Sequence, residues 1–178
     1  MSRLFLAFIL LFFLFVTLVQ ADLIPSGYKK MARKYGIPEK IFYSVMMQES
    51  SSTTKTGHKP WPWTLNVKGV GGIRYPTRLK AYYALEKALK KTSVVDVGLG
   101  QVNWHWNGKR FKSTWQALDP YTNLRVAAQI LKEEYINGGG DWWVAVGRYH
   151  SPGQKPKQKQ RARNYISMVK RRYKRIAS

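Results

Sequence analysis

The chain has 178 residues, a length typical of one ordinary domain, and 44% of them are hydrophobic, which is enough to build a buried core. It contains 31 Lys and Arg against 9 Asp and Glu, for a formal net charge of +22, and it contains no cysteine. This composition excludes wholesale disorder, disulfide scaffolds, thiol nucleophiles and zinc sites of the Cys type. Carboxylate chemistry, if present, has few candidate residues.

The first 21 residues have the pattern of a secretory signal peptide. Arg3 precedes an uncharged run from Leu4 to Val19 that is rich in Leu and Phe, and small side chains up to Ala21 define a cleavage site. The alternative is an uncleaved membrane anchor, although the run is short of the roughly 20 residues that span a bilayer. We therefore expect residues 1–21 to be removed, residues 22–178 to form a single domain, and the protein to act in the periplasm.

The rest of the chain is predicted to be mostly helical. Apolar periodicity predicts helices over residues 24–35, 38–49, 76–91, 121–136, 141–150 and 160–176. Gly36 ends the first helix, Pro38 opens the second, and Asp119 and Asp141 are start signals for two later ones. Residues 51–75 are rich in Ser, Thr, Gly and Pro, which predicts a long irregular excursion or a small hairpin. The expected fold is a single, mainly α domain.

One carboxyl group lies on the apolar side of the second predicted helix. On a helical wheel, Glu49 falls in the middle of the stripe made by Ile41, Phe42, Val45 and Met46. The opposite side carries Lys40, Tyr43, Ser44, Met47 and Gln48. A carboxyl held in an apolar setting has a raised pKa and can donate a proton to a leaving oxygen. Periodicity alone leaves open that Glu49 turns to solvent where the helix ends.

Four motifs along the chain occur in the order of a known family. They are Glu49-Ser50, then Asp96-Val97-Gly98-Leu99-Gly100-Gln101-Val102-Asn103, then Asn123-Leu124 with Ala127-Ala128, then Ala145-Val146-Gly147-Arg148-Tyr149-His150-Ser151-Pro152. This set resembles the lytic transglycosylases of the soluble-lytic-transglycosylase (SLT) type, in which a Glu-Ser pair, a Gly-Leu-Met-Gln turn and a late Tyr follow one another. The resemblance covers roughly residues 28–152. It implies a lysozyme-like fold of the goose-type/SLT kind, a cleft for peptidoglycan glycan strands, and no cofactor.

The resemblance also implies a reaction in which Glu49 is the single catalytic acid and base. In the family, the acid protonates the oxygen that links N-acetylmuramic acid to N-acetylglucosamine. It then takes the proton of the muramyl C6 hydroxyl, which closes on C1 to give a 1,6-anhydro sugar. One carboxyl group is enough because no water is consumed, whereas hydrolytic glycosidases usually pair two.

Further roles follow from the same resemblance. It implies substrate-binding positions at Ser50, Gly98, Leu99, Gln101, Asn103 and Tyr149. Ser50 would hydrogen-bond near the acid or cap the helix end. Gln101 and Asn103 would offer amide groups to acetamido substituents. Tyr149 would place its hydroxyl near Glu49, with core packing as its alternative.

The sequence departs from the family pattern at two positions. Gly100 stands where Met is common, so one apolar wall of the sugar pocket is either missing or supplied from elsewhere. His150 follows Tyr149 where Asn is usual. Tryptophan rings suit the apolar faces of sugars but can equally close the core, and both interpretations apply to Trp61, Trp63, Trp104 and Trp106.

The placement of Asp96 distinguishes two enzymes. If its carboxylate faces Glu49 across the cleft at about 6.5 to 9.5 Å, an attacking water fits between them and the protein is an inverting lysozyme, a hydrolytic muramidase. If Asp96 caps backbone amides of the glycine turn, the transglycosylase interpretation holds. We expect the second arrangement, which is the usual one for an acid just before such a turn.

The C-terminal segment is strongly basic. Residues 155–178 carry ten Lys or Arg and no acid, and they predict a final helix whose outer face concentrates the enzyme on an anionic wall or membrane surface. Export argues against a nucleic-acid partner, and the membrane is a partner only through an uncleaved signal segment. A non-catalytic basic module that binds cell wall or DNA is the distant alternative. The small size favours action beside a secretion, conjugation or pilus machine. The three histidines are too scattered to predict a metal site.

Overall fold

The computed structural model describes residues 24–54 and 57–176, so the predicted signal peptide lies outside the described residues. The helices are α2 (Ser26–Lys34), α3 (Glu39–Ser50), α4 (Arg78–Leu89), α5 (Trp104–Asn107), α6 (Thr114–Ala117), α7 (Pro120–Asn137), α8 (Trp142–His150) and α9 (Pro156–Arg175), with a 3₁₀ turn η1 (Gly108–Arg110). The strands are β1 (Ser51–Thr54), β2 (Gly57–Pro60), β3 (Thr64–Val67), β4 (Gly71–Arg74), β5 (Val95–Val97) and β6 (Val102–Asn103). The expected mainly α architecture is confirmed.

The six predicted helices are all present, and their start signals act as expected. Asp119 caps α7 by accepting from the Thr122 amide, and Asp141 caps α8 by accepting from the amides of Trp143 and Val144. The last helix begins at Pro156 rather than at residue 160, because proline is favourable at the first helical position.

The excursion at residues 51–75 is more regular than a loop. It forms two antiparallel hairpins, β1 with β2 and β3 with β4. Strand β3 also pairs with β5, and β5 pairs with β6, which gives a four-stranded sheet in the order β4-β3-β5-β6. The register places Asn66 opposite Asp96, and Asp96 opposite Asn103, so three polar side chains lie side by side across three strands.

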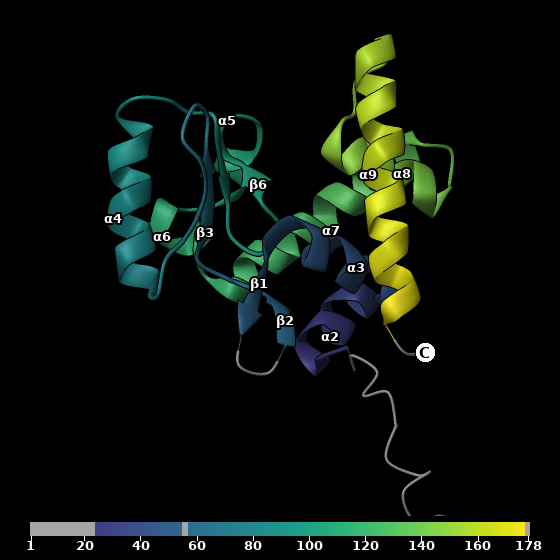
Figure 1. The fold of residues 1–178 in the computed structure, drawn as a ribbon, viewed down its shortest axis with the longest axis horizontal. Coiled ribbons are helices and arrows are strands. Elements are labelled where there is room, and N and C mark those ends of the chain that lie inside the picture. The colour runs from purple at the N-terminus through teal and green to yellow at the C-terminus, as the bar shows by residue number, and fades with distance from the viewer. Residues whose placement is uncertain (1–23, 55–56, 177–178) are drawn as a thin grey trace, which may run out of the picture.

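The long helix α7 connects the two sides of the molecule. The sheet, α4, α5 and α6 form one side, and α2, α3, α8 and α9 form the other (Figure 1). Helix α7 contacts α2 and α8 on one side, and α6 and β6 on the other. One helix therefore positions both halves.

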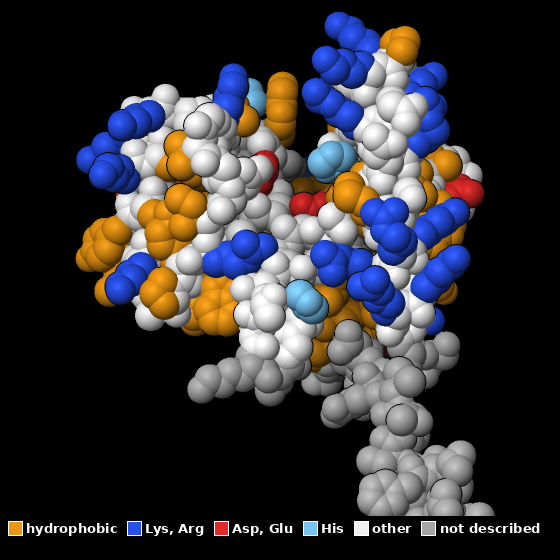
Figure 2. Space-filling model, in the orientation of Figure 1, with side chains coloured by type: hydrophobic (Ala, Val, Ile, Leu, Met, Phe, Trp, Pro, Cys, Tyr) orange, Lys and Arg blue, Asp and Glu red, His pale blue; other side chains and the backbone are white. Residues whose placement is uncertain are grey.

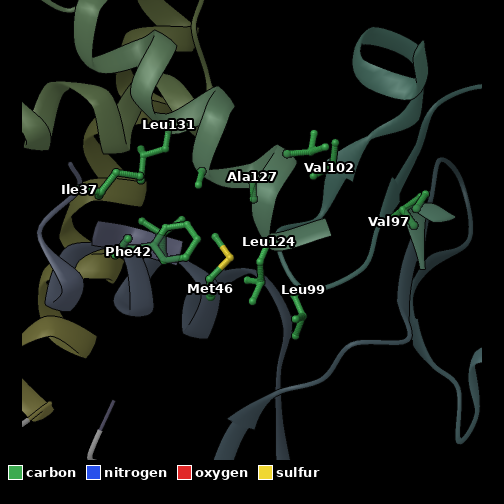
Figure 3. Packing of buried hydrophobic residues seen from close by; sticks show 14 of the residues in the cluster. Ile37, Phe42, Met46, Val97, Leu99, Val102, Leu124, Ala127 and Leu131 are labelled. Carbon is green, nitrogen blue, oxygen red and sulfur yellow. The ribbon is translucent and has the colours of Figure 1, made fainter. Parts of the chain in front are cut away.

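The hydrophobic core follows the apolar stripe of α3. Phe42 and Met46 are fully buried and belong to the same cluster as Leu99 and Leu124 of the neighbouring segments (Figure 3). The far side of α3 is covered as well, because α2 and α9 pack there, so Tyr43, Ser44 and Met47 are also buried. Helix α3 is thus enclosed nearly all round, and its C-terminal end opens toward the sheet side.

Candidate active site

A cleft of about 750 Å³ lies between the two sides of the molecule. Figure 2 shows it as a hollow with acidic side chains, in red, inside it. Its walls come from the end of α3, from β3, β5 and β6, and from α7 and α8. The sequence-predicted residues on these walls are Glu49, Asp96, Gln101, Asn103, Tyr149 and His150.

Glu49 lies at the C-terminal end of α3, where part of its surface opens on the cleft. The Tyr165 hydroxyl of α9 donates a hydrogen bond to its Oε1 atom. Burial raises the pKa of Glu49 from 4.5 to about 7; the Tyr165 hydrogen bond opposes this rise, and the negative charge of Asp96 adds to it. A carboxyl group with this pKa can both donate and accept a proton near neutral pH.

Two tyrosines flank this carboxyl group, and only one of them contacts it by a hydrogen bond. The Tyr149 hydroxyl donates instead to the Gly100 carbonyl, at 2.7 Å. Burial, followed by the nearby charge of Glu49, raises the pKa of Tyr149 well above its ordinary value, and the same two causes raise the pKa of Tyr165. Both hydroxyls therefore stay protonated and act as donors. Tyr149 lies near Glu49 as expected. Its hydroxyl, however, donates to the glycine turn, and the hydroxyl that hydrogen-bonds to Glu49 belongs to Tyr165.

Tyr165 is a site residue that the sequence did not predict. It stands on the apolar stripe of the basic last helix, where a purely structural role sufficed. Its aromatic ring is stacked on His150, with ring centroids 4.5 Å apart and an interplanar angle of 3°. One feature of the sequence could have indicated this role: Tyr165 lies on a predicted buried stripe, and a buried tyrosine hydroxyl needs a hydrogen-bond partner.

Ser50 joins the end of α3 to the glycine turn. Its Oγ atom lies 2.7 Å from the Leu99 carbonyl, to which it donates, and 3.2 Å from the Met46 carbonyl one helical turn back. The contact with Met46 lies at the helix end and the contact with Leu99 lies in the glycine turn, and the hydrogen-bond partner of the Glu49 carboxyl group is Tyr165 instead. Ser50 is fully buried and lies outside the cleft lining, so it supports the site without facing the substrate.

The glycine turn is held from α7 by Asn123. Its Nδ2 atom donates to the carbonyls of Val97 and Ala117, and its Oδ1 atom accepts from the Gly100 amide, each at 2.9 Å. Gly98 has a φ of 79°, and a Cβ atom there would overlap Asn123 Nδ2. Only glycine satisfies both conditions. Gly98 and Leu99 thus shape the turn and do not line the cleft.

The departure at Gly100 has a steric cause. A Cβ atom at this position would lie 2.5 Å from Ala127 Cβ and 3.0 Å from the Tyr149 hydroxyl. Helix α7 and Tyr149 therefore fill the space that a larger side chain would need. Neither Gly100 nor Ala127 lines the cleft, and the apolar side chain that α7 contributes to the cleft wall is Ile130.

The two predicted substrate amides have their N–H groups turned into the protein. Gln101, whose φ is 45°, donates through Nε2 to the carbonyls of Thr64 and Gly98 at 3.1 and 2.9 Å. Asn103 donates through Nδ2 to Asp96 Oδ1 at 2.7 Å. Both residues line the cleft, as expected, but Gln101 already donates twice within the protein and Asn103 donates once.

The expectation that Asp96 caps backbone amides of the glycine turn is wrong. Its Oδ1 accepts from Asn103, and its Oδ2 accepts from Asn66 at 3.0 Å, because the strand register places both asparagines beside it. The turn amide of Gly100 is capped by Asn123 instead. Asp96 lines the same cleft as Glu49.

The aromatic residues divide into packed and open ones. Trp106 is 74% exposed and lines the cleft, where its ring offers an apolar face to a sugar. Trp104 is half-buried and stacked on Phe111, with centroids 6.2 Å apart. Trp61 and Trp63 are half-buried in edge-to-face contact with each other and do not line the cleft.

Metal-binding and membrane-spanning features are absent from residues 24–54 and 57–176. No three His, Asp or Glu side chains gather there in an arrangement that holds a metal ion. No helix within these ranges is long and apolar enough to cross a membrane.

Comparison with known proteins connects this site to a family. Residues 28–170 match the family described as the Transglycosylase SLT domain, a span that includes the cleft and most of α9. No curated protein and no solved structure matches the chain. The matched span carries Glu49 and Tyr165, as well as the glycine turn. The chain therefore belongs to the Transglycosylase SLT domain family, within the lysozyme-like superfamily.

Proposed function

We propose that this protein cleaves the β-1,4 bond between N-acetylmuramic acid and N-acetylglucosamine in peptidoglycan and forms a 1,6-anhydro end. Family membership supports lytic transglycosylase activity in general. The observation that supports the specific role of Glu49 is its partly buried position on the cleft wall. Its pKa is raised to about 7, and the Tyr165 hydroxyl donates a hydrogen bond to one of its oxygens.

The proposed reaction uses one carboxyl group twice. Protonated Glu49 gives its proton to the glycosidic oxygen as the bond from that oxygen to muramyl C1 breaks. The resulting carboxylate, stabilised by the Tyr165 hydroxyl, takes the proton of the C6 hydroxyl as O6 bonds to C1. Glu49 therefore ends the reaction protonated, as it began, and no water is incorporated into the products.

Hydrolysis is the second candidate, because Asp96 lines the same cleft. In a hydrolytic muramidase Asp96 would activate a water molecule. Against this, each Asp96 oxygen accepts a hydrogen bond from an asparagine, which gives Asp96 a structural role in the sheet wall, and the family match supports lytic transglycosylase activity. We therefore favour the anhydro-forming reaction.

Mass spectrometry of digested peptidoglycan tests the proposal. Anhydro-muropeptides weigh one water less than hydrolytic products, so the fragments distinguish the two reactions directly. The E49Q variant is the control, because Gln keeps the oxygen that accepts from Tyr165 but has no acidic proton to transfer. Lysis by E49Q at the wild-type rate would remove Glu49 from its assigned role, and fragments with a free reducing end would favour hydrolysis.

The basic exterior supports a proposal about location. We place the enzyme in the periplasm after signal-peptide cleavage, with the cationic outer face of α9 holding it near anionic wall or membrane surfaces. Figure 2 shows Lys and Arg side chains gathered along this helix. Fractionation of cells expressing the full chain tests the location. Co-purification tests a secretion, conjugation or pilus machine as a partner, and DNA binding without wall turnover would favour the non-catalytic alternative.

A further inference from the structure

Three polar side chains form a row across the sheet wall of the cleft. Asn66 on β3 and Asn103 on β6 each donate an amide hydrogen to one oxygen of Asp96 on β5, at 3.0 and 2.7 Å. We propose that Asp96 is a positioning residue, which turns the Asn66 carbonyl oxygen toward the cleft to accept the N–H of a sugar's acetamido group. The inference rests on the proposed function, since it names how the same cleft recognises its substrate.

The orientation of both amides follows from the chemistry of their shared partner. An ionised carboxylate only accepts hydrogen bonds, so each asparagine must turn its NH₂ group to Asp96 and its carbonyl oxygen elsewhere. The carbonyl of Asn103 faces the Trp106 amide at 3.4 Å, at the start of α5. The carbonyl of Asn66 has no hydrogen-bond partner within residues 24–54 and 57–176, and Asn66 is exposed on the cleft wall. One of the two asparagines is thus an open acceptor.

Gln101 repeats this arrangement next to Asn66. Its two amide hydrogens go to the carbonyls of Thr64 and Gly98, so its Oε1 atom is likewise left without a protein partner in the described part of the chain. Gln101 lies in the turn between β5 and β6 and bonds the backbone of Thr64 on β3, two residues before Asn66, so the two amides lie close together on the cleft wall. The sheet wall therefore presents two carbonyl acceptors, Asn66 Oδ1 and Gln101 Oε1, each oriented by hydrogen bonds that its own amide nitrogen donates to the protein.

This pattern complements a ligand that brings a donor. An acetamido N–H can only donate, and it matches a fixed acceptor, whereas a sugar hydroxyl can donate or accept and gains less from the fixed orientation. The wall should therefore favour sugars with a 2-acetamido group over plain hexoses. The energetic role of Asp96 is to hold Asn66 before the ligand arrives, since a preoriented group loses less entropy on binding.

Calorimetric titration of the E49Q protein tests the inference without any turnover. The ligands are the N-acetylglucosamine tetrasaccharide and its glucose counterpart, cellotetraose. In the E49Q background, N66L should weaken binding of the acetylated ligand by about tenfold, the loss of one hydrogen bond, and should leave cellotetraose binding nearly unchanged. D96L should do the same, although Asp96 is not the group that contacts the ligand.

A double-mutant cycle separates positioning from a general structural role. If Asp96 acts through Asn66, the D96L/N66L protein binds no more weakly than N66L alone. Additive losses, equal losses for both ligands, or unchanged binding in D96L would each overturn the inference, as would a parent E49Q protein that binds neither ligand. N137L, at the exposed end of α7 outside the cleft, is the matched control.

Two further measurements keep the test independent of folding and of the reaction. D96N retains the side-chain volume but donates as well as accepts, so it should lose part of the preference for the acetylated ligand even if D96L unfolds. Digestion of peptidoglycan by the wild-type protein is scored separately. Absence of turnover with intact, Asn66-dependent binding overturns the proposed reaction only, and turnover without that dependence overturns the inference only.

Discussion

The hydroxyl of Tyr165 reaches the carboxyl group of Glu49 from a position 116 residues later in the chain. The contact exists because α9 packs against both α3 and α8. The basic C-terminal helix is therefore more than a charged exterior, since its buried side supplies a group to the candidate active site. The outer side of the same helix remains cationic (Figure 2).

The first prediction concerns the pH dependence of wild-type activity. Glu49 must carry its proton to act as an acid, and burial raises its pKa to about 7. Activity on purified peptidoglycan should therefore fall as the pH rises through about 7. An alkaline limit set near 4.5, the value of an unperturbed Glu, would contradict the buried, proton-donating role.

The second prediction concerns Tyr165. Its hydrogen bond stabilises the carboxylate and so lowers the pKa of Glu49 relative to burial alone. The Y165F protein should lose about tenfold in rate at pH 6, and its alkaline limit should move to higher pH. The comparison is made with full pH–rate profiles. Y173F, which changes a tyrosine of the same helix that packs on Trp143, should keep the wild-type limit.

The third prediction turns the same pKa into a stability difference. Between pH 4.5 and about 7, Glu49 binds more protons in the folded protein than in the unfolded chain. The free energy of unfolding of the wild-type protein therefore falls as the pH rises through this range. The stability of E49Q relative to wild type should therefore increase by about 2–3 kcal/mol between pH 4 and pH 8. Urea unfolding at the two pH values measures it. An equal difference at both would show that Glu49 is solvated like an ordinary surface acid.

The fourth prediction concerns the contact between Gly100 and Ala127. G100A places a methyl group against Ala127, and should destabilise the fold by about 1–3 kcal/mol in denaturant unfolding. In an A127G background the same change should cost about 1 kcal/mol less, because the opposing methyl group is gone. G27A on α2, where a new Cβ atom would make only an ordinary contact at 3.7 Å, should not destabilise. Equal costs of G100A in both backgrounds would rule out the clash as the cause.

The sequence is informative where the signal is local. Helix periodicity and capping residues predict the six long helices. The apolar stripe of α3 makes Glu49 a candidate, and the order of the motifs along the chain selects it. Strands β5 and β6 have three and two residues, too few to show an alternating pattern, so periodicity does not predict them. Their register decides which side chains surround Asp96, and this explains why the partners expected for Asp96 are wrong.

The remaining site features depend on contacts between distant segments. Asn123 and Tyr165 act through helices that meet the glycine turn and α3 only in the folded chain. A single sequence shows that these residues are on buried stripes but not which polar group each one meets. The orientation of Gln101 is of the same kind, because its partners include Thr64, 37 positions earlier.

The position of α7 has a mechanical consequence for the enzyme. One continuous helix carries contacts to both sides of the cleft, and no separate hinge segment joins them along this helix. We expect this helix to hold the width of the cleft fixed, so that a glycan enters without the two sides moving apart. The preference for one peptidoglycan strand over another would then depend on the side chains that line the two sides of the cleft, such as Trp106, and not on movement of the two sides of the molecule.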